Sequence, residues 1–345
     1  MKIVSIKEIA EHLGLSRNTV SKVLNGKPGV LPETEEKIIR AAQQLGYNKL
    51  SSELLQKLEP AAPAQPPVQP GGQIVLLTNG ENVNSFWSGI ISGVYSALSG
   101  SGYSLIYSEI RPGQHHLLPE ILYEGKVDGL IVTDLYDLEI WKAIRKTGIP
   151  TVFLDSPVNI SDEYAGGDIV LTEGIISVKE LTGQLIADGA KKLAFVGDIT
   201  GCQTMFDRWC GFYQAMIEAG MKLEERLLFT SSPDHFYKEE TIHDVIESMA
   251  ELPDAIVCAN DAIARAVIRE LKARHIQVPG QICVSGFDNS PGDPIVTSVA
   301  VDYPELSRRL VRQLFWRMQE KRASREIVRI RTEVIYREST QKNKK

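Results

Sequence analysis

The chain has 345 residues, 43% of them hydrophobic, and a formal net charge of −6. This length predicts two or three domains, and the lack of any apolar run of about twenty residues argues against a membrane span. The first eight residues lack the apolar core of a signal peptide, and the four cysteines form no Cys-x-x-Cys motif. We therefore expect a cytoplasmic protein with reduced thiols and no membrane partner.

Residues 5–26 carry two short apolar stripes at helical spacing, separated by a turn. The stripes comprise Ile6, Ile9, Ala10 and Leu13, followed by Val20, Val23 and Leu24. Gly14 lies where a left-handed residue ends a helix, and Ser16 lies where a hydroxyl caps the next one. Two amphipathic helices joined by about three residues are typical of a helix-turn-helix.

The second of these helices would expose polar side chains suited to DNA. Arg17 and Asn18 stand in its first turn, and these residue types make bidentate contacts with guanine and adenine edges. The predicted DNA-contacting residues here are Ser5, Ser16, Arg17, Asn18, Thr19, Ser21, Lys22 and Asn25. Arg17 and Asn18 would read bases, whereas Lys22 would hold a phosphate. The alternative is a helical hairpin with a solvated polar face.

Charge is unevenly distributed along the chain. Residues 1–58 hold nine Lys or Arg and six Asp or Glu, a net +3, so the remaining residues carry −9. A small basic module on an acidic body suits DNA binding that is confined to one end.

A third apolar stripe follows Pro32, a residue favoured at a helix start, and predicts a three-helix core on which Tyr47 packs. Residues 1–50 resemble the DNA-binding headpiece of the LacI/GalR family of bacterial transcription regulators. The resemblance rests on Val-Ser-Ile-Lys-Glu-Ile-Ala, Gly-Leu-Ser, Thr-Val-Ser-Lys-Val-Leu-Asn-Gly and Leu-Gly-Tyr. It implies a homodimer whose two recognition helices lie in successive major grooves of a pseudo-palindromic operator in double-stranded DNA.

Residues 48–58 depart from that family. Asn48 and Lys49 replace its usual Pro-Asn, and Gln56 stands about where the family has a leucine that wedges into the minor groove. The remaining helical stripe consists of Leu50, Leu54, Leu55 and Leu58. We take Leu55 as the residue that kinks DNA by unstacking a base step. A short dimerising helix is an equally good interpretation.

Residues 60–73 contain five prolines in fourteen positions, which predicts an extended polyproline linker. From residue 74 onward, short apolar strands alternate with amphipathic helices. The expected strands are 74–77, 103–107, 129–132, 151–154, 193–196, 255–258 and 282–285. The expected helices include 86–98, 176–186, 205–219, 261–273 and 304–318. Such alternation predicts parallel sheets with helices on both faces.

The predicted fold is an all-α helix-turn-helix headpiece joined to an α/β bilobed body with two parallel, doubly wound sheets. The expected domains are the headpiece 1–58, the linker 59–73 and the body 74–340. Within the body, the first lobe would take about 74–173 and 303–322, and the second about 174–302 and 323–340. Ligands of open α/β sheets bind beyond the carboxyl ends of the strands, which here face a cleft between the lobes.

Short motifs after the strands resemble the periplasmic-binding-protein-like core of the same family. They are Asn84-Ser85-Phe86-Trp87, Phe153-Leu154-Asp155, Arg208-x-x-Gly211-Phe212, Asn260-Asp261-x-x-Ala264 and Gly286-Phe287-Asp288-Asn289. The resemblance implies an effector site formed by Phe86, Trp87, Asp155, Arg208, Asn260, Asp288 and Tyr303. A sugar would suit these groups, because its hydroxyls match planar polar side chains and its C–H face lies against an aromatic ring.

Each of these residues also has a structural interpretation. Asp155 and Asp288 could cap helices, Arg208 could form an ion pair between lobes, and Asn260 is a good helix N-cap. Phe86 and Trp87 could be ordinary packing at a helix start.

Motifs of several other function classes are missing. The sequence has no Gly-x-Gly-x-x-Gly, no P-loop, no Gly-x-Ser-x-Gly and no zinc-type Cys/His spacing. We therefore expect no enzyme activity, no cofactor and no metal. The leading hypothesis is a sequence-specific transcription regulator, a repressor, controlled by a small-molecule effector such as a sugar. The alternatives are a regulator whose effector is a partner protein, and a sugar-binding protein without DNA reading.

Overall fold

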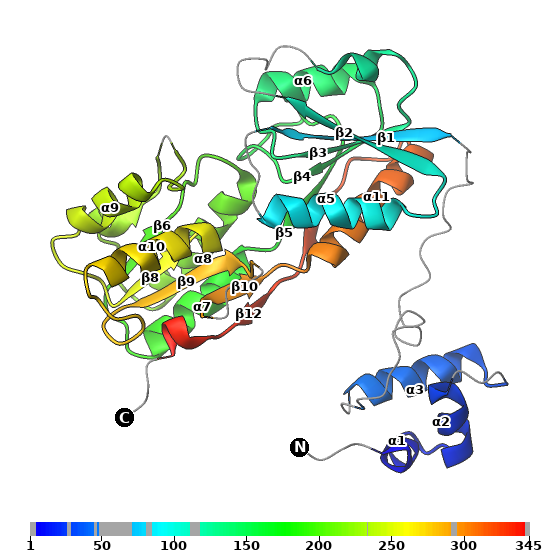
Figure 1. Ribbon diagram of the computed structural model, residues 1–345, viewed down its shortest axis with the longest axis horizontal. Coiled ribbons are helices and arrows are strands. Elements are labelled where there is room, and N and C mark those ends of the chain that lie inside the picture. Colours follow the sequence, from blue (N-terminus) through cyan, green and yellow to red (C-terminus); the bar gives the residue numbers. More distant parts are fainter. Residues whose placement is uncertain are drawn as a thin grey trace. The chain divides into compact units, whose positions relative to one another are not determined.

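The computed structural model describes residues 5–25, 29–44, 47, 71–80, 85–110, 118–232, 234–290 and 295–341. It divides into two compact units, Met1–Gln65 and Pro66–Lys345, each of which is described by itself (Figure 1). Residues 48–58, which include Leu55, and nearly all of the predicted linker lie outside the described residues. Among the helices of the described ranges, none is long and apolar enough to cross a membrane.

The N-terminal unit contains three helices, as the apolar stripes predict. These are α1 (Ile6–Leu13), α2 (Arg17–Leu24) and α3 (Pro32–Gln44). Their buried faces form one small core of Ile9, Ala10, Val20, Val23, Leu24, Ile38, Ile39, Ala41 and Ala42. Gly14 has φ of +64°, which confirms the left-handed residue expected after α1. Tyr47 packs against the core, as predicted.

The first lobe of the body is built on a six-stranded sheet with the order β11-β5-β4-β3-β1-β2. Its strands are β1 (Gly72–Asn79), β2 (Tyr103–Ile110), β3 (Gly129–Thr133), β4 (Thr151–Leu154), β5 (Asp168–Thr172) and β11 (Ile327–Ile330). One face packs on α5 (Ser85–Leu98) and α11 (Tyr303–Gln319), and the other on α6 (Leu138–Thr147). All pairings in this sheet are parallel.

The second lobe has its own six-stranded sheet, with the order β12-β10-β9-β8-β6-β7. Its strands are β6 (Leu193–Val196), β7 (Leu228–Phe229), β8 (Ala255–Cys258), β9 (Cys283–Asp288), β10 (Thr297–Ala300) and β12 (Glu333–Ile335). Its helices are α7 (Ile175–Ala187), α8 (Gln203–Glu218), α9 (Glu239–Ser248) and α10 (Asp261–Ala273). Single turns of 3₁₀-helix occur at Glu120–Tyr123, Glu225–Leu227 and Glu338–Thr340.

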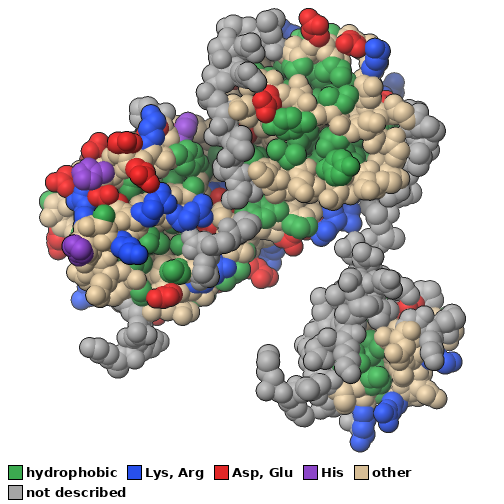
Figure 2. All heavy atoms as spheres, in the orientation of Figure 1, with side chains coloured by type: hydrophobic (Ala, Val, Ile, Leu, Met, Phe, Trp, Pro, Cys, Tyr) green, Lys and Arg blue, Asp and Glu red, His purple; other side chains and the backbone are tan. Residues whose placement is uncertain are grey.

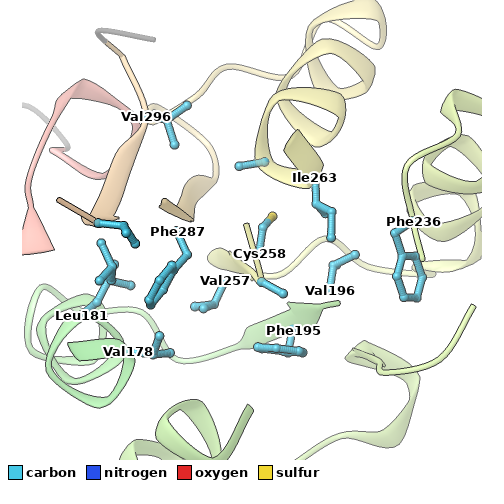
Figure 3. Packing of buried hydrophobic residues seen from close by; sticks show 14 of the residues in the cluster. Val178, Leu181, Phe195, Val196, Phe236, Val257, Cys258, Ile263, Phe287 and Val296 are labelled. Atoms are coloured by element: carbon cyan, nitrogen blue, oxygen red, sulfur yellow. The ribbon is translucent and has the colours of Figure 1, made fainter. Parts of the chain in front are cut away.

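Alternating side chains of the second sheet bury its two faces (Figure 3). Phe195, Val257 and Phe287 point to the side of α7, where Val178 and Leu181 meet them. Val196 and Cys258, the next residues of β6 and β8, point to the opposite side with Ile263 of α10. Burial on both faces is why these strands read as continuous apolar runs in the sequence.

Two details differ from the sequence expectation. Strand β12 runs antiparallel to β10 at the edge of an otherwise parallel sheet. Residues 323–340 were expected to lie in the second lobe as a block, but Ile327–Ile330 form β11, which pairs with β5 of the first sheet. The chain therefore adds an edge strand to the first lobe before it crosses to the second. This short strand is half exposed, so its sequence carries no apolar run that would reveal it.

Candidate DNA-reading helix and ligand cleft

Helix α2 presents one polar face and buries the other. Ser16 caps it, since its Oγ accepts a hydrogen bond from the backbone N–H of Thr19 at 3.1 Å. Val20, Val23 and Leu24 anchor the opposite face in the core. A short helix held in this way holds its exposed side chains at a set spacing for a groove.

The predicted DNA-contacting residues lie on or next to that polar face. Arg17, Asn18 and Lys22 are exposed, and Thr19 and Ser21 are half-buried. Asn25 ends the helix, and its Nδ2 donates to the backbone oxygen of Ser21 at 2.7 Å. Ser5 is exposed just before α1.

The body contains a cavity of about 360 Å³ between its two lobes, lined by residues of both. It lies at the carboxyl ends of parallel strands, the position expected for ligands in open α/β sheets. Six of the seven predicted effector residues line it, namely Phe86, Trp87, Asp155, Arg208, Asn260 and Asp288.

The seventh, Tyr303, does not line the cavity. Its ring lies 5.5 Å from that of Phe86, edge to face, and its hydroxyl donates to the backbone oxygen of Asp288 at 2.9 Å. Tyr303 therefore supports two lining residues from behind, since it starts α11 on the far side of Phe86. Phe86 in turn packs edge-on against Trp87, with ring centroids 4.8 Å apart.

Arg208 and Asp288 form a buried ion pair with a long separation of 3.5 Å between Nη2 and Oδ1. Arg208 also donates from Nη1 to the backbone oxygen of Ala259 at 2.7 Å, and its guanidinium lies 3.7 Å from the ring centroid of Phe287. Its buried Nε has no hydrogen-bond partner among the described residues. Burial raises the pKa of Asp288 to about 7, although Arg208 opposes that shift. Both residues belong to the second lobe, so this ion pair does not join the lobes.

Asp155 joins the lobes instead. It follows β4 of the first lobe, yet its Oδ1 accepts from the backbone N–H of Thr204 in α8 at 3.2 Å, and its other oxygen accepts from the Thr204 hydroxyl. Ser156 N–H donates to the same Oδ1 at 2.8 Å. Burial raises the pKa of Asp155, although these hydrogen bonds oppose that shift. The capping role that the sequence left open for Asp155 is thus the one its contacts describe, across the cleft.

Asn260 has a double role. Its Oδ1 accepts from the backbone N–H of Ile263 at 2.9 Å and so caps α10, as predicted. Its Nδ2 donates to the hydroxyl of Tyr237 at 3.0 Å, and Tyr237 itself lines the cavity. Burial raises the pKa of Tyr237 to about 12.

Several lining residues were not predicted, chiefly Tyr136, Asp198, His235 and Tyr237. His235 Nδ1 lies 2.7 Å from Asp198 Oδ2, and the φ of His235 is +53°. Burial alone would raise the pKa of Asp198, but hydrogen bonds from Thr200 and His235 outweigh it and lower that pKa. These residues follow β3, β6 and β7. Strand-end position is the signal that could have found them, but they lack the motifs that revealed the others.

No group of three or more His, Cys, Asp or Glu residues that could hold a metal ion occurs within the described ranges. A model of the family "Bacterial regulatory proteins, lacI family" matches residues 5–49, and one of a "Periplasmic binding protein-like domain" matches residues 182–340. The chain belongs to the lacI family. Members of this family are DNA-binding transcription regulators and not enzymes.

Curated relatives of this lacI-family chain match over nearly its whole length. The HTH-type transcriptional regulator CelR of Thermobifida fusca is 27% identical over 351 residues, 97% of this chain and 98% of the relative. The HTH-type transcriptional repressor PurR of Photobacterium profundum is 27% identical over 356 residues, 98% of each chain.

Solved structures share the fold. A transcriptional regulator CelR–cellobiose complex has a TM-score of 0.69 and 24% identity over 97% of this chain and 99% of that one. The Lac repressor dimer bound to operator and the anti-inducer ONPF has a TM-score of 0.66 and 20% identity over 98% of this chain and 99% of that one.

Proposed function

We propose that this chain is a repressor whose affinity for a pseudo-palindromic DNA operator is controlled by a small sugar bound in the cleft. The observation that carries the DNA half is the geometry of α2. Arg17 and Asn18 stand exposed in its first turn, while its opposite face is anchored in the core. Those two side chains would read base edges, and Lys22 would neutralise a phosphate.

The cleft supports the effector half of the proposal. Arg208, Asp288 and Asn260 bring planar polar groups to one cavity, and Phe86 and Trp87 bring aromatic rings. A sugar ring has the matching surfaces, since its hydroxyls pair with such groups and its C–H face lies against aromatic rings. The relative solved with cellobiose gives this choice of ligand class further support.

Contacts between the lobes suggest how ligand binding in the cleft would change DNA binding. Asp155 of the first lobe caps α8 of the second, and Arg329 of β11 pairs with the buried Asp207 of α8. A ligand that bound one lobe arrangement better than another would shift the population of that arrangement. In a dimer, that shift would change the separation of the two headpieces.

A homodimer is part of the proposal. Tyr95 on α5 is 70% exposed and Tyr107 on the edge strand β2 is 46% exposed, although both elements belong to the packed first lobe. Figure 2 shows hydrophobic side chains gathered on one face of that lobe. Large exposed apolar surface of this kind is typical of an interface. We expect Tyr95→Asp to shift the dimer towards monomer in sedimentation velocity.

The decisive experiment is selection from a randomised duplex library, with the bound pool sequenced and each enriched site measured by fluorescence polarisation. We expect a two-fold-symmetric site with half-sites about one helical turn apart. Adding neutral sugars to the same assay should change the affinity for that site. No enrichment, together with tight sugar binding by the protein, would favour a sugar-binding protein without DNA reading.

The competing hypothesis is that the effector is a partner protein and not a sugar. It predicts that no sugar changes either DNA affinity or thermal stability, whereas our proposal predicts that at least one sugar changes both.

A further inference from the structure

Three helix N-termini that border the cleft are already capped by the protein's own oxygens. Asp137 caps α6, accepting from the N–H groups of Glu139 and Ile140 at 2.7 and 3.2 Å. Asp155 covers the Thr204 N–H at the start of α8, and Asn260 caps α10. Free N–H groups at a helix N-terminus are what usually holds a phosphate or carboxylate. At these three helices, the side-chain oxygens of Asp137, Asp155 and Asn260 already accept hydrogen bonds from such N–H groups.

The charged residues that line the cleft are mostly acidic. Among the described lining residues they are Asp134, Asp137, Asp155, Asp198 and Asp288, against Arg208 and His235. An anion in this cavity would therefore lie near several acidic side chains, three of which, Asp134, Asp155 and Asp198, are buried. Burial raises the pKa of Asp155 and that of Asp288, so the remaining carboxylates of the set supply most of the negative charge near neutral pH. Like charges at such distances repel strongly in a cavity of low dielectric.

Both cationic candidates are already engaged with these carboxylates. Arg208 donates to Ala259 and pairs with Asp288, which leaves only Nε without a partner among the described residues. His235 uses Nδ1 on Asp198 at 2.7 Å. A bidentate fork on an anion would have to share guanidinium nitrogens that already contact Ala259 and Asp288.

We infer that the effector of this cleft is a neutral sugar, and that phosphorylated or carboxylated forms of the same sugar are rejected. The inference rests on the proposed effector function of the cleft and adds the charge class of its ligand. The cavity of about 360 Å³ is at the small end of ligand pockets, which span roughly 300–1,000 Å³. Aromatic rings at Phe86, Trp87, Tyr136 and Tyr237 provide flat surfaces for sugar C–H faces.

The test uses the full-length protein and matched ligand pairs in thermal-shift and calorimetric titrations. Each neutral pentose, hexose or disaccharide is paired with its own phosphate and its own sugar acid, so size and hydroxyl pattern are preserved. We expect at least one neutral sugar to bind roughly 100-fold more tightly than its anionic partners. Equal or tighter binding of an anionic member overturns the inference but leaves a ligand-controlled regulator intact.

A charge-removing variant tests the cause. Asp137→Asn keeps a good N-cap for α6 but removes one lining carboxylate, so the preference for the neutral member should narrow by about tenfold. Asp302→Asn is the matched control, because Asp302 caps α11 in the same way, accepting from Glu305 at 2.8 Å, and does not line the cleft. It changes the net charge equally, and the preference should stay at its wild-type value.

The remaining outcomes distinguish a failure of the charge preference from a failure of the proposed sugar effector. A preference that narrows equally in both variants points to the field of the whole protein and contradicts a role for the lining carboxylates. If no sugar in the panel binds, neutral or anionic, the sugar effector itself is contradicted and the inference falls with it.

Discussion

The polar residues of α2 and those of the cleft differ in how much they contribute to the fold. On α2, Arg17, Asn18 and Lys22 stand out in solvent, while other residues of the helix hold the fold. In the cleft, Asp155 and Asn260 line the cavity of the proposed effector site while they also cap helices. On our proposal, different residues of the headpiece bind DNA and stabilise the fold, whereas in the cleft the same residues would do both.

This difference predicts how substitutions behave. A change at an exposed α2 residue should alter DNA affinity and leave unfolding unchanged. A change at a buried cleft residue should alter both ligand binding and stability, since it also leaves a partner unsatisfied. The experiments below test that contrast.

The largest effect is expected for Arg208→Leu. Above pH 7, where Asp288 is ionised, removing the guanidinium leaves a buried charge without its cation and the backbone oxygen of Ala259 without a donor, which should cost roughly 3–5 kcal/mol. Urea unfolding of the body, followed by tryptophan fluorescence, measures this. The control is Arg269→Leu, whose exposed ion pair with Glu239 at 3.2 Å should contribute less than about 1 kcal/mol. Similar losses of unfolding free energy in the two variants would contradict the expected difference between buried cleft residues and exposed residues.

The next effect is a pH dependence centred on Asp288. Its folded pKa of about 7 lies above the ordinary value near 3.9, so between those values the folded state holds a proton that the unfolded state has released. The free energy of unfolding should therefore fall as pH rises from about 4 to about 7, by roughly 2–4 kcal/mol. Asp288→Asn should remove this component, which difference curves against wild type would reveal. Parallel curves between pH 5 and 7 would refute the buried, protonated carboxyl.

The sequence predicted those parts of the molecule that local patterns determine. The three headpiece helices follow from apolar spacing, and β4, β6, β8 and α10 begin and end at the predicted residues. Ser16 and Asn260 cap helices as predicted, because an N-cap depends only on the next few residues.

What escaped prediction depends on residues that are far apart in the chain. Strand β11 is recognisable only by its pairing with β5, more than 150 positions earlier. Tyr303 stands behind Phe86 because of how α11 packs on α5, which no local pattern encodes. His235 and Asp198 approach each other from two separate loops. For the same reason, the sequence could name Asp155 as a strand-end residue but not choose between ligand contact and a cap across the cleft.

A smaller effect is expected at the polar face of α2, which we propose reads DNA. Arg17→Ala should remove discrimination of about 1–3 kcal/mol at one base pair and leave unfolding unchanged. Lys22→Ala should weaken binding to all sequences alike and lower the slope of affinity against salt by about one ion. Fluorescence polarisation on cognate and scrambled duplexes over a salt series distinguishes these patterns. Equal losses on both duplexes for both variants would show that α2 does not read sequence.

The smallest effect concerns Ser16, which caps α2 and is also predicted to contact DNA. Its Oγ accepts from the Thr19 N–H at 3.1 Å, so Ser16→Ala should lower headpiece stability by about 1 kcal/mol. Ser16→Asn should retain the cap and hence the stability. If Ser16 also contacts DNA, the asparagine variant should change operator affinity at unchanged stability, measured by polarisation and thermal unfolding. Affinity that follows stability in both variants would mean that Ser16 acts on DNA only through the helix it caps, and the division between reading and folding residues on α2 would then be complete.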